Sequence, residues 1–231
     1  MTTPLLHYIH DPLCGWCYGA APLVRVARQV LPVQAHAGGM MIGASRRPVT
    51  PALRQFVMGH DRRIAQASGQ PFGEAYFEGL LRDTTAVLDS GPPITALLAA
   101  EELAQAGLDL LARLQTAHYV EGRRIADSAV LQALAIELGM DAEGFAAALD
   151  RWSGAATQAH IAQSRALLAR VGGQGFPTFA IESGGQFSTV DVGRFLGQPE
   201  AWRDWLAALE GVSNAADTAP SPFCGLDGCA P

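Results

Sequence analysis

Residues 5–17 read LLHYIHDPLCGWC and specify the fold class of the chain. Leu5 to His10 is a short apolar run that stops at Asp11 and Pro12, and a proline cannot donate a hydrogen bond to a sheet ladder. We therefore expect a buried strand at Leu5 to His10. From Cys14 to about Val30 the apolar residues recur at helical spacing, so the sequence predicts that a helix follows this strand directly.

Cys14 and Cys17 enclose Gly15 and Trp16 at the predicted start of this helix. Unpaired backbone N–H groups and the helix dipole favour negative charge there, so we expect Cys14 to be a reactive thiolate whose sulfur is exposed to solvent. Cys17 follows one turn later and is placed to close a disulfide. A strand before the motif and a helix after it are typical of a redox dithiol. Half of a zinc site and a chance pair of buried cysteines are the alternatives.

The composition excludes several classes of chemistry. The chain has 231 residues, of which 49% are hydrophobic, so it is long enough for a sizeable core. All 16 basic residues are arginine, which rules out a Schiff-base lysine and a phosphate-loop lysine. A net charge of −6 without a basic stripe argues against nucleic acid or an anionic membrane as a partner.

The sequence also bears on location and on metal binding. No apolar run is long enough to span a bilayer and no arginine precedes Arg25, so we expect no membrane segment and no secretory leader. We expect a cytoplasmic protein, and in that reducing compartment a cysteine pair is more often catalytic or metal-binding than structural. The histidines lack metal-ligand spacing, and His60-Asp61 alone matches no catalytic triad, so no metal site is predicted.

Further elements follow from changes in hydrophobic period. Val33 to Ala37 is a second predicted strand, parallel to the first through a right-handed crossover. Pro22 is expected to bend the helix between them. After the helical region, Phe176 to Val190 has the pattern of a hairpin, and an amphipathic helix begins at Pro199.

These elements predict three regions. Residues 1–49 and 172–211 form an α/β domain, residues 50–171 form a helical insertion domain, and residues 212–231 form a flexible tail. Gly38 to Arg47 contains glycines and two arginines but matches no phosphate-binding fingerprint, so we expect a surface loop there.

The chain resembles DsbA-type members of the thioredoxin superfamily, in particular the cytoplasmic branch of predicted protein disulfide isomerases. The resemblance is carried by DPLCGWCY at residues 11–18, by the helix proline Pro22, and by GFPT at residues 175–178. It implies an α/β, thioredoxin-like fold with a large all-α insertion between the second strand and a cis-proline hairpin. It implies that Cys14 attacks and that Cys17 resolves.

The same resemblance implies a substrate-binding segment made of Phe176, Pro177 and Thr178. The Phe176–Pro177 bond is expected to be cis and to face the disulfide, with the backbone of residue 176 available to pair with a substrate. An apolar patch that receives flexible polypeptide is one interpretation of Trp16, Tyr18 and Phe176. Ordinary packing is the alternative, and it is the one expected for Tyr18.

The chain departs from this family at two positions. Relatives carry a buried carboxylate six residues before the first cysteine, where this chain has Tyr8, so His10 and Asp11 are the nearest candidates for proton transfer. The dipeptide Gly15-Trp16 lacks the histidine that makes DsbA strongly oxidising. With Gly15, Trp16, His10 and Asp11 tuning the site, we expect a reduction potential between about −180 and −270 mV.

We therefore expect a thiol–disulfide oxidoreductase or isomerase that acts on protein or peptide disulfides. No cofactor is predicted, and glutathione or the thioredoxin system is the expected reductant. The alternatives are a glutathione-binding enzyme similar to kappa-class transferases or 2-hydroxychromene-2-carboxylate isomerases, and a redox-sensing chaperone or zinc-binding module. The glutathione-binding relatives typically have serine where Cys14 stands, which favours the oxidoreductase.

The tail carries a second pair of cysteines, Cys224 and Cys229, in a C-x4-C spacing. From Leu209 to Cys224 the chain can extend roughly 45 to 50 Å, which exceeds a domain radius of about 17 Å, so this pair is able to reach Cys14. A tethered dithiol of this kind can recharge or reset the active-site disulfide. A disulfide that stabilises the tail, a metal-binding pair and a chance terminal motif are the alternatives.

Overall fold

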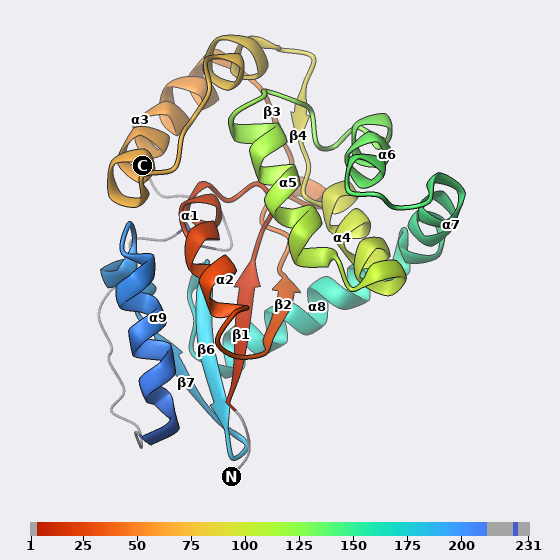
Figure 1. The fold of residues 1–231 in the computed structure, drawn as a ribbon. Coiled ribbons are helices and arrows are strands. Elements are labelled where there is room, and N and C mark those ends of the chain that lie inside the picture. The colour runs from red at the N-terminus through yellow and green to blue at the C-terminus, as the bar shows by residue number, and fades with distance from the viewer. Residues whose placement is uncertain (1–3, 212–223, 226–231) are drawn as a thin grey trace.

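The computed structural model describes residues 4–211 and 224–225, and a four-stranded sheet lies at its centre (Figure 1). The strands run in the order β2-β1-β6-β7, with bounds β1 (Leu5–His10), β2 (Val33–Ala37), β6 (Thr178–Ser183) and β7 (Gln186–Val190). β1 pairs parallel with β2 and antiparallel with β6, and β6 pairs antiparallel with β7. Both predicted strands and the predicted hairpin are confirmed.

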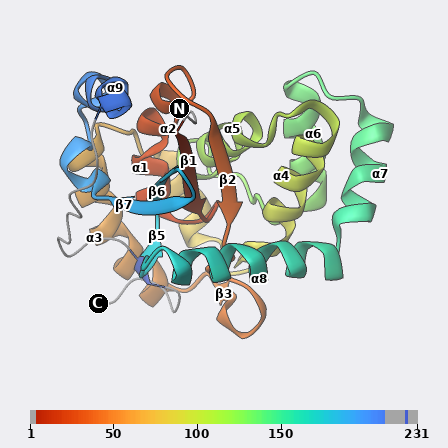
Figure 2. The ribbon, with the colours of Figure 1, turned by 90° about the horizontal axis from the view of Figure 1, so that it is seen from below.

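Helices cover both faces of this sheet. The first two helices along the chain are α1 (Gly15–Gly19) and α2 (Ala21–Ala27), and the last α-helix of the described residues is α9 (Pro199–Ala207). In Figure 2, α2 and α9 lie on one side of the sheet and α8 (Ala155–Arg170) lies on the other. The indole N–H of Trp202 on α9 donates to the carbonyl oxygen of Leu23 on α2 at 3.0 Å, which joins these two helices below the surface.

The segment after Cys14 forms two helices where the sequence predicts one bent helix. α1 ends at Gly19 and α2 begins at Ala21, with Pro22 in the first turn of α2. Proline has no N–H to donate but is well accommodated in a first turn, where that N–H would lack a helical partner anyway. Pro22 therefore starts a new helix instead of bending a continuous one.

The long helical region contains most of the remaining elements. Its helices are α3 (Pro51–Ser68), α4 (Gly91–Ala104), α5 (Gly107–Tyr119), α6 (Ser128–Glu137), α7 (Ala142–Trp152) and α8, with a π-helical turn η2 (Ala75–Gly79). Short 3₁₀ turns occupy η1 (Gly43–Ser45), η3 (Leu80–Arg82), η4 (Val192–Phe195) and η5 (Ala208–Gly211). Two strand pairs lie outside the main sheet, β3 (Arg47–Pro48) with β4 (Val87–Leu88), and β5 (Gly175–Phe176) with β8 (Cys224–Gly225).

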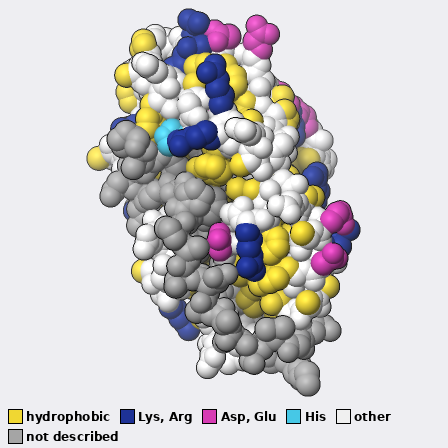
Figure 3. All heavy atoms as spheres, turned by 90° about the vertical axis from the view of Figure 1, so that its left-hand side faces the viewer, with side chains coloured by type: hydrophobic (Ala, Val, Ile, Leu, Met, Phe, Trp, Pro, Cys, Tyr) yellow, Lys and Arg dark blue, Asp and Glu magenta, His cyan; other side chains and the backbone are white. Residues whose placement is uncertain are grey.

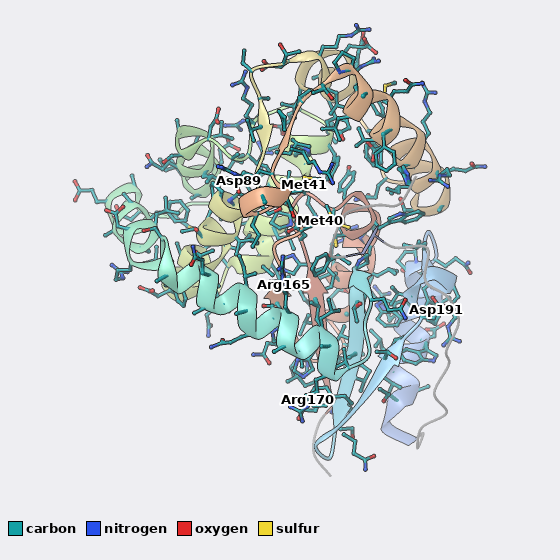
Figure 4. The ribbon with its side chains drawn as sticks, turned by 180° about the vertical axis from the view of Figure 1, so that it is seen from behind. Met40, Met41, Asp89, Arg165, Arg170 and Asp191 are labelled. Atoms are coloured by element: carbon teal, nitrogen blue, oxygen red, sulfur yellow. The ribbon has the colours of Figure 1, made fainter. Side chains whose placement is uncertain are left out.

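α8 connects the helical region to the sheet. The ring of His160 accepts a hydrogen bond from the backbone N–H of Ala37 in β2 at 3.1 Å. Further along α8, Arg165 donates to the carbonyl oxygens of Gly38 and Gly39, and Figure 4 shows this side chain beside the segment that carries Met40 and Met41. One hydrophobic cluster contains residues of the sheet and of α4 to α7. The domain boundaries proposed from the sequence stay a prediction.

The predicted fold class is confirmed, since a four-stranded sheet is interrupted in the chain by a large block of helices. None of the helices in the described ranges is both long and apolar enough to cross a bilayer.

Candidate active site

Cys14 stands at the N-terminal cap of α1. Its backbone is extended, with φ −86° and ψ 115°, and its sulfur accepts a hydrogen bond from the backbone N–H of Cys17 at 3.4 Å. The first turn of α1 contains no acidic residue. A thiolate at this position therefore has a backbone donor and no carboxylate within its own helix to oppose it.

Both sulfurs of the motif belong to free cysteines, and both side chains are buried. Burial, followed by the hydrogen bond and the proximity of Cys14, raises the pKa of the Cys17 thiol well above its usual value. The expectation of a solvent-exposed Cys14 sulfur is wrong for this conformation, because its exposed fraction is 0%. A substrate disulfide reaches Cys14 only after neighbouring groups move aside.

The groups that cover Cys14 include the cis-proline segment. The Phe176–Pro177 peptide bond is cis, as the resemblance implies. The Cys14 thiol donates to the carbonyl oxygen of Phe176 at 3.3 Å, and Thr178 donates its hydroxyl to the carbonyl of Gly175 at 2.7 Å. The structure thus brings the two motifs together across 162 positions of sequence.

The aromatic residues of these motifs form packing contacts instead of the expected open patch. Trp16 and Phe176 are both buried. Tyr18 is also buried, where its hydroxyl donates to the carbonyl of Pro71 at 2.7 Å and its ring stacks on Tyr119 with centroids 4.8 Å apart. The sequence does not reveal how completely the helical region encloses α1, which is why the prediction of an exposed patch fails.

His10 is buried at the end of β1, and its environment keeps it uncharged. Burial first, and then the proximity of His160 and His36, lower the pKa of His10 to about 3. Its ring stacks on Tyr8 with centroids 4.8 Å apart, and its Nδ1 atom has no hydrogen-bond partner. His10 therefore supplies no positive charge to Cys14 near neutral pH.

Asp11 ties the cysteine motif to the segment after β2. One carboxylate oxygen accepts from the N–H of Leu13 at 2.8 Å and from the hydroxyl of Ser90 at 2.9 Å, and the other accepts from the N–H of Met40 at 2.6 Å. Burial raises the pKa of Asp11, and these three hydrogen bonds oppose that rise. In this structure Asp11 binds two backbone N–H groups and the hydroxyl of Ser90, and so joins three segments of the chain.

The prediction of a surface loop at Gly38 to Arg47 is wrong for the first part of that segment. Gly38, Gly39 and Met40 are buried, whereas Arg46 and Arg47 are exposed. A Cβ atom at Gly38 would stand 2.3 Å from the ring of Phe176, so only glycine allows the loop to pass beneath this ring. The glycines thus serve a close approach to the active site.

A cavity of about 600 Å³ opens beside the cysteine motif. It lies between α1, α3 and the Met40 segment, and its walls include Gly15, Met40, Phe56, His60 and Asp61. Most of the other lining residues are apolar, so the cavity combines an apolar surface with a few polar side chains.

Asp61 is the residue of this cavity that the sequence analysis missed. It is only 4% exposed, and its Oδ2 atom accepts from the hydroxyl of Tyr76 at 3.0 Å. Its Oδ1 atom lies 3.1 Å from the place where a Cβ of Gly15 would stand. Burial raises the pKa of Asp61 to about 7, although the bond from Tyr76 opposes the rise.

A signal for Asp61 is present in the sequence. Asp61, Ile64 and Ser68 form the buried face of α3. A carboxylate that falls on the apolar face of an amphipathic helix indicates a buried charge, and a buried charge requires a partner or an altered pKa. The pair His60-Asp61 matches no catalytic triad in the sequence, but the position of Asp61 on the helix is itself informative.

The second cysteine pair is described only in part. The backbone of Cys224 is paired with that of Phe176 in the β5–β8 ladder, and Cys229 lies outside the described residues. Within the described ranges, no three His, Cys, Asp or Glu side chains are grouped as a metal ion would require.

Comparisons with known proteins show the family to which the chain belongs. Residues 74–197 match the DSBA-like thioredoxin domain family. The solved structure of the cytosolic disulfide reductase DsbM from Pseudomonas aeruginosa is 56% identical, with a TM-score of 0.84, covering 89% of this chain and 98% of that one. A structure of DsbM with GSH is 54% identical, with a TM-score of 0.83, covering 90% of this chain and 100% of that one.

More distant structures share the fold. A protein from Nitrosomonas europaea is 25% identical with a TM-score of 0.74, covering 91% of this chain and 100% of that one. A 2-hydroxychromene-2-carboxylate isomerase is 19% identical with a TM-score of 0.55, covering 89% of this chain and 97% of that one, and it shows the fold alone. No curated protein matched the chain. Because the family match spans more than half of the sequence and DsbM is 56% identical, the chain belongs to the DSBA-like thioredoxin domain family of disulfide oxidoreductases.

Proposed function

We propose that this protein reduces disulfides of proteins and peptides through Cys14 and Cys17, with glutathione as its reductant. The observation that carries the proposal is the position of the Cys14 sulfur. It lies 3.4 Å from the N–H of Cys17 and 3.3 Å from the carbonyl oxygen of Phe176. The attacking atom thus lies between the resolving cysteine and a backbone edge that suits an extended substrate.

The reaction proceeds by two exchanges. The Cys14 thiolate attacks one sulfur of the substrate disulfide, a Cys14–substrate bond forms, and the other substrate sulfur leaves as a thiolate. The Cys17 thiolate then attacks the Cys14 sulfur and releases the second substrate thiolate. The substrate gains two electrons and the enzyme retains a Cys14–Cys17 disulfide. Two glutathione molecules return that disulfide to the dithiol and become glutathione disulfide.

The order of the two cysteines follows from their surroundings. The raised pKa of Cys17 keeps its thiol protonated near neutral pH. The N–H of Cys17 is oriented toward the sulfur of Cys14, where it stabilises a thiolate. Cys14 therefore attacks first, and Cys17 acts after it loses its proton.

The cavity beside Gly15 supports glutathione or a peptide as the ligand. Its volume of about 600 Å³ falls within the range of small-molecule sites. Arg47 and His60 line it together with apolar side chains of α3. On the face that carries α3 and α9, hydrophobic side chains lie in clusters between arginines, a surface that suits peptide segments (Figure 3). The relative DsbM was solved with GSH.

The same chemistry allows isomerisation. If a substrate thiolate attacks the Cys14–substrate bond before Cys17 does, the substrate is released with a rearranged disulfide. We place the protein in the cytoplasm, since the relative DsbM is described as cytosolic. The thioredoxin system is the second candidate reductant, and it reduces the Cys14–Cys17 disulfide by the same exchange.

The test is reduction of insulin and of a fluorescent peptide disulfide under glutathione recycling. We expect turnover from the natural chain, a loss of at least about 100-fold in Cys14→Ser, and a trapped peptide adduct in Cys17→Ser. Ser153→Ala is the matched control, since its exposed hydroxyl is bonded only to the carbonyl of Asp150.

Three results would contradict the proposal. If Cys14→Ser retained turnover, these thiols would not carry the activity. If the protein conjugated glutathione to an electrophile and left disulfides intact, the transferase alternative would hold. If the Cys14→Ser variant suppressed aggregation as well as the natural chain does, and the natural chain showed no exchange activity, a chaperone role would hold.

A further inference from the structure

The backbone edge beside the Cys14 sulfur is paired with another segment of the same chain. β8 (Cys224–Gly225) runs antiparallel to β5 (Gly175–Phe176), with Cys224 opposite Phe176. The carbonyl oxygen of Phe176 is the atom to which Cys14 donates its hydrogen bond. We propose that Cys224 is an intramolecular exchange partner of Cys14, held at the active site by this strand pairing. The inference rests on the proposed function.

The pairing places the backbone of Cys224 beside a residue that Cys14 contacts. Residues that stand directly opposite each other in an antiparallel pair have Cα atoms about 4.5 to 5.5 Å apart. Cys224 stands opposite Phe176, and the Cys14 sulfur lies 3.3 Å from the carbonyl oxygen of Phe176. The two cysteines are therefore neighbours of the same residue, and a disulfide between them requires Cα atoms roughly 4.4 to 6.8 Å apart.

β5 has no place in the main sheet. The main sheet consists of β2, β1, β6 and β7, whereas β5 forms a separate two-stranded ladder with β8. An extended peptide that adds a strand to an open edge gains main-chain hydrogen bonds at low cost. The Cys224 segment therefore binds where an extended peptide substrate would bind, and the two compete for the same edge.

The exchange balances within the chain. When Cys224 and Cys229 form a disulfide, the Cys14 thiolate attacks the sulfur of Cys224, a Cys14–Cys224 bond forms, and Cys229 leaves as a thiolate. The Cys17 thiolate then attacks Cys14 and releases the Cys224 thiolate. Two electrons pass from the active site to the tail, and the reverse steps return them. The part of Cys229 follows from the C-x4-C spacing alone.

Two full-length variants distinguish between two cases: Cys224 is held beside Cys14 by strand pairing, or the chain merely tethers both tail cysteines near the active site. Cys17→Ser/Cys229→Ser leaves only Cys14 and Cys224, whereas Cys17→Ser/Cys224→Ser leaves only Cys14 and Cys229. Each is equilibrated in glutathione redox buffer, and the intramolecular disulfide is quantified by peptide mapping without reduction. The result is expressed as the effective concentration of the tail thiol at Cys14.

We expect the effective concentration of Cys224 to exceed that of Cys229 by about tenfold or more. A flexible tether presents both thiols at similar concentrations, on the order of mM, because their distances along the chain differ little. Equal values for the two variants, or no intramolecular disulfide in either, would overturn the inference.

The glutathione adduct of Cys14 keeps this test separate from the proposed function. If Cys14 forms an adduct with glutathione but shows no preference for Cys224, the tail inference fails and the proposed function survives. If Cys14 forms no disulfide with glutathione and the natural chain reduces no peptide disulfide, both fail together.

Discussion

Two buried carboxylates flank the cysteine motif, and their surroundings differ. Asp11, at the end of β1, accepts three hydrogen bonds, from Leu13, Ser90 and Met40. Asp61, on α3, has one side-chain bond, from the hydroxyl of Tyr76. Burial raises the pKa of both, and that of Asp61 reaches about 7.

The difference separates a structural carboxylate from a titrating one. Three donors compensate Asp11 for the loss of water, so its carboxylate mainly organises the backbone around it. A single tyrosine leaves Asp61 incompletely compensated beside Gly15, so its charge changes near physiological pH. Asp11 is the candidate for proton transfer that the sequence suggests, whereas Asp61 is the carboxylate whose pKa burial raises to about 7.

Replacement of Asp11 is expected to have the larger effect on stability. Asp11→Ala leaves two backbone N–H groups and a serine hydroxyl buried without their acceptor, and such groups cost about 1 to 3 kcal/mol each. We expect the free energy of unfolding to fall by about 5 kcal/mol in urea titration. Asp141→Ala, which removes an exposed cap bonded only to the N–H of Gly144, should cost about 1 kcal/mol. Equal losses would show that Asp11 has no special structural role.

Replacement of Asp61 is expected to change how stability depends on pH. The folded pKa of about 7 lies above the unfolded value of 3.8, so the folded state binds more protons and loses stability as pH rises from about 4 to 7. Asp61→Asn lacks this loss. Relative to the natural chain it should gain stability between pH 4 and pH 8, by at most about 4 kcal/mol.

Tyr76→Phe provides the matched control for Asp61. It removes the hydrogen bond that lowers the pKa of Asp61, so the loss of stability should extend to higher pH than in the natural chain. Thermal unfolding measured from pH 4 to pH 9 gives both curves. Parallel curves for the natural chain and Asp61→Asn would mean that Asp61 does not titrate in this range.

The reduction potential is expected to show the smallest effect. His10 is uncharged, and the other two buried side chains, Asp11 and Asp61, are acids. None of the three therefore places a positive charge beside Cys14. We expect the Cys14–Cys17 couple to lie between about −180 and −270 mV, and Trp16→His to raise it by about 30 mV, equivalent to about 1.4 kcal/mol. Titration in glutathione buffers measures both values. A natural potential near −120 mV would contradict this account of the dipeptide.

Much of the architecture follows from local patterns of sequence. The strand at Leu5–His10, its partner at Val33–Ala37 and the hairpin after Phe176 are confirmed, because apolar alternation and glycine turns act over a few residues. The two helices around Pro22 differ from the prediction because the sequence does not distinguish a bent helix from a new one.

The site was only partly predictable, for a related reason. The cysteine motif, the GFPT motif and the cis bond were identified from short motifs and the family resemblance. Three features of the site depend on groups 29 to 162 positions away in the chain. They are the burial of Cys14, the close approach of Gly38 to Phe176 and the hydrogen bond from Met40 to Asp11. Asp61 was missed although it lies on the apolar face of α3, and its position beside Gly15 appears only when α3 packs against α1.

By itself, the sequence determined most of the elements, the C-x-x-C cysteine pair and the fold class, because hydrophobic period, proline and glycine act locally along a chain. The tertiary structure determined which groups share the site. Burial and hydrogen bonding depend on neighbours from distant segments, so they place Phe176 over Cys14, neutralise His10 and raise the pKa of Asp61.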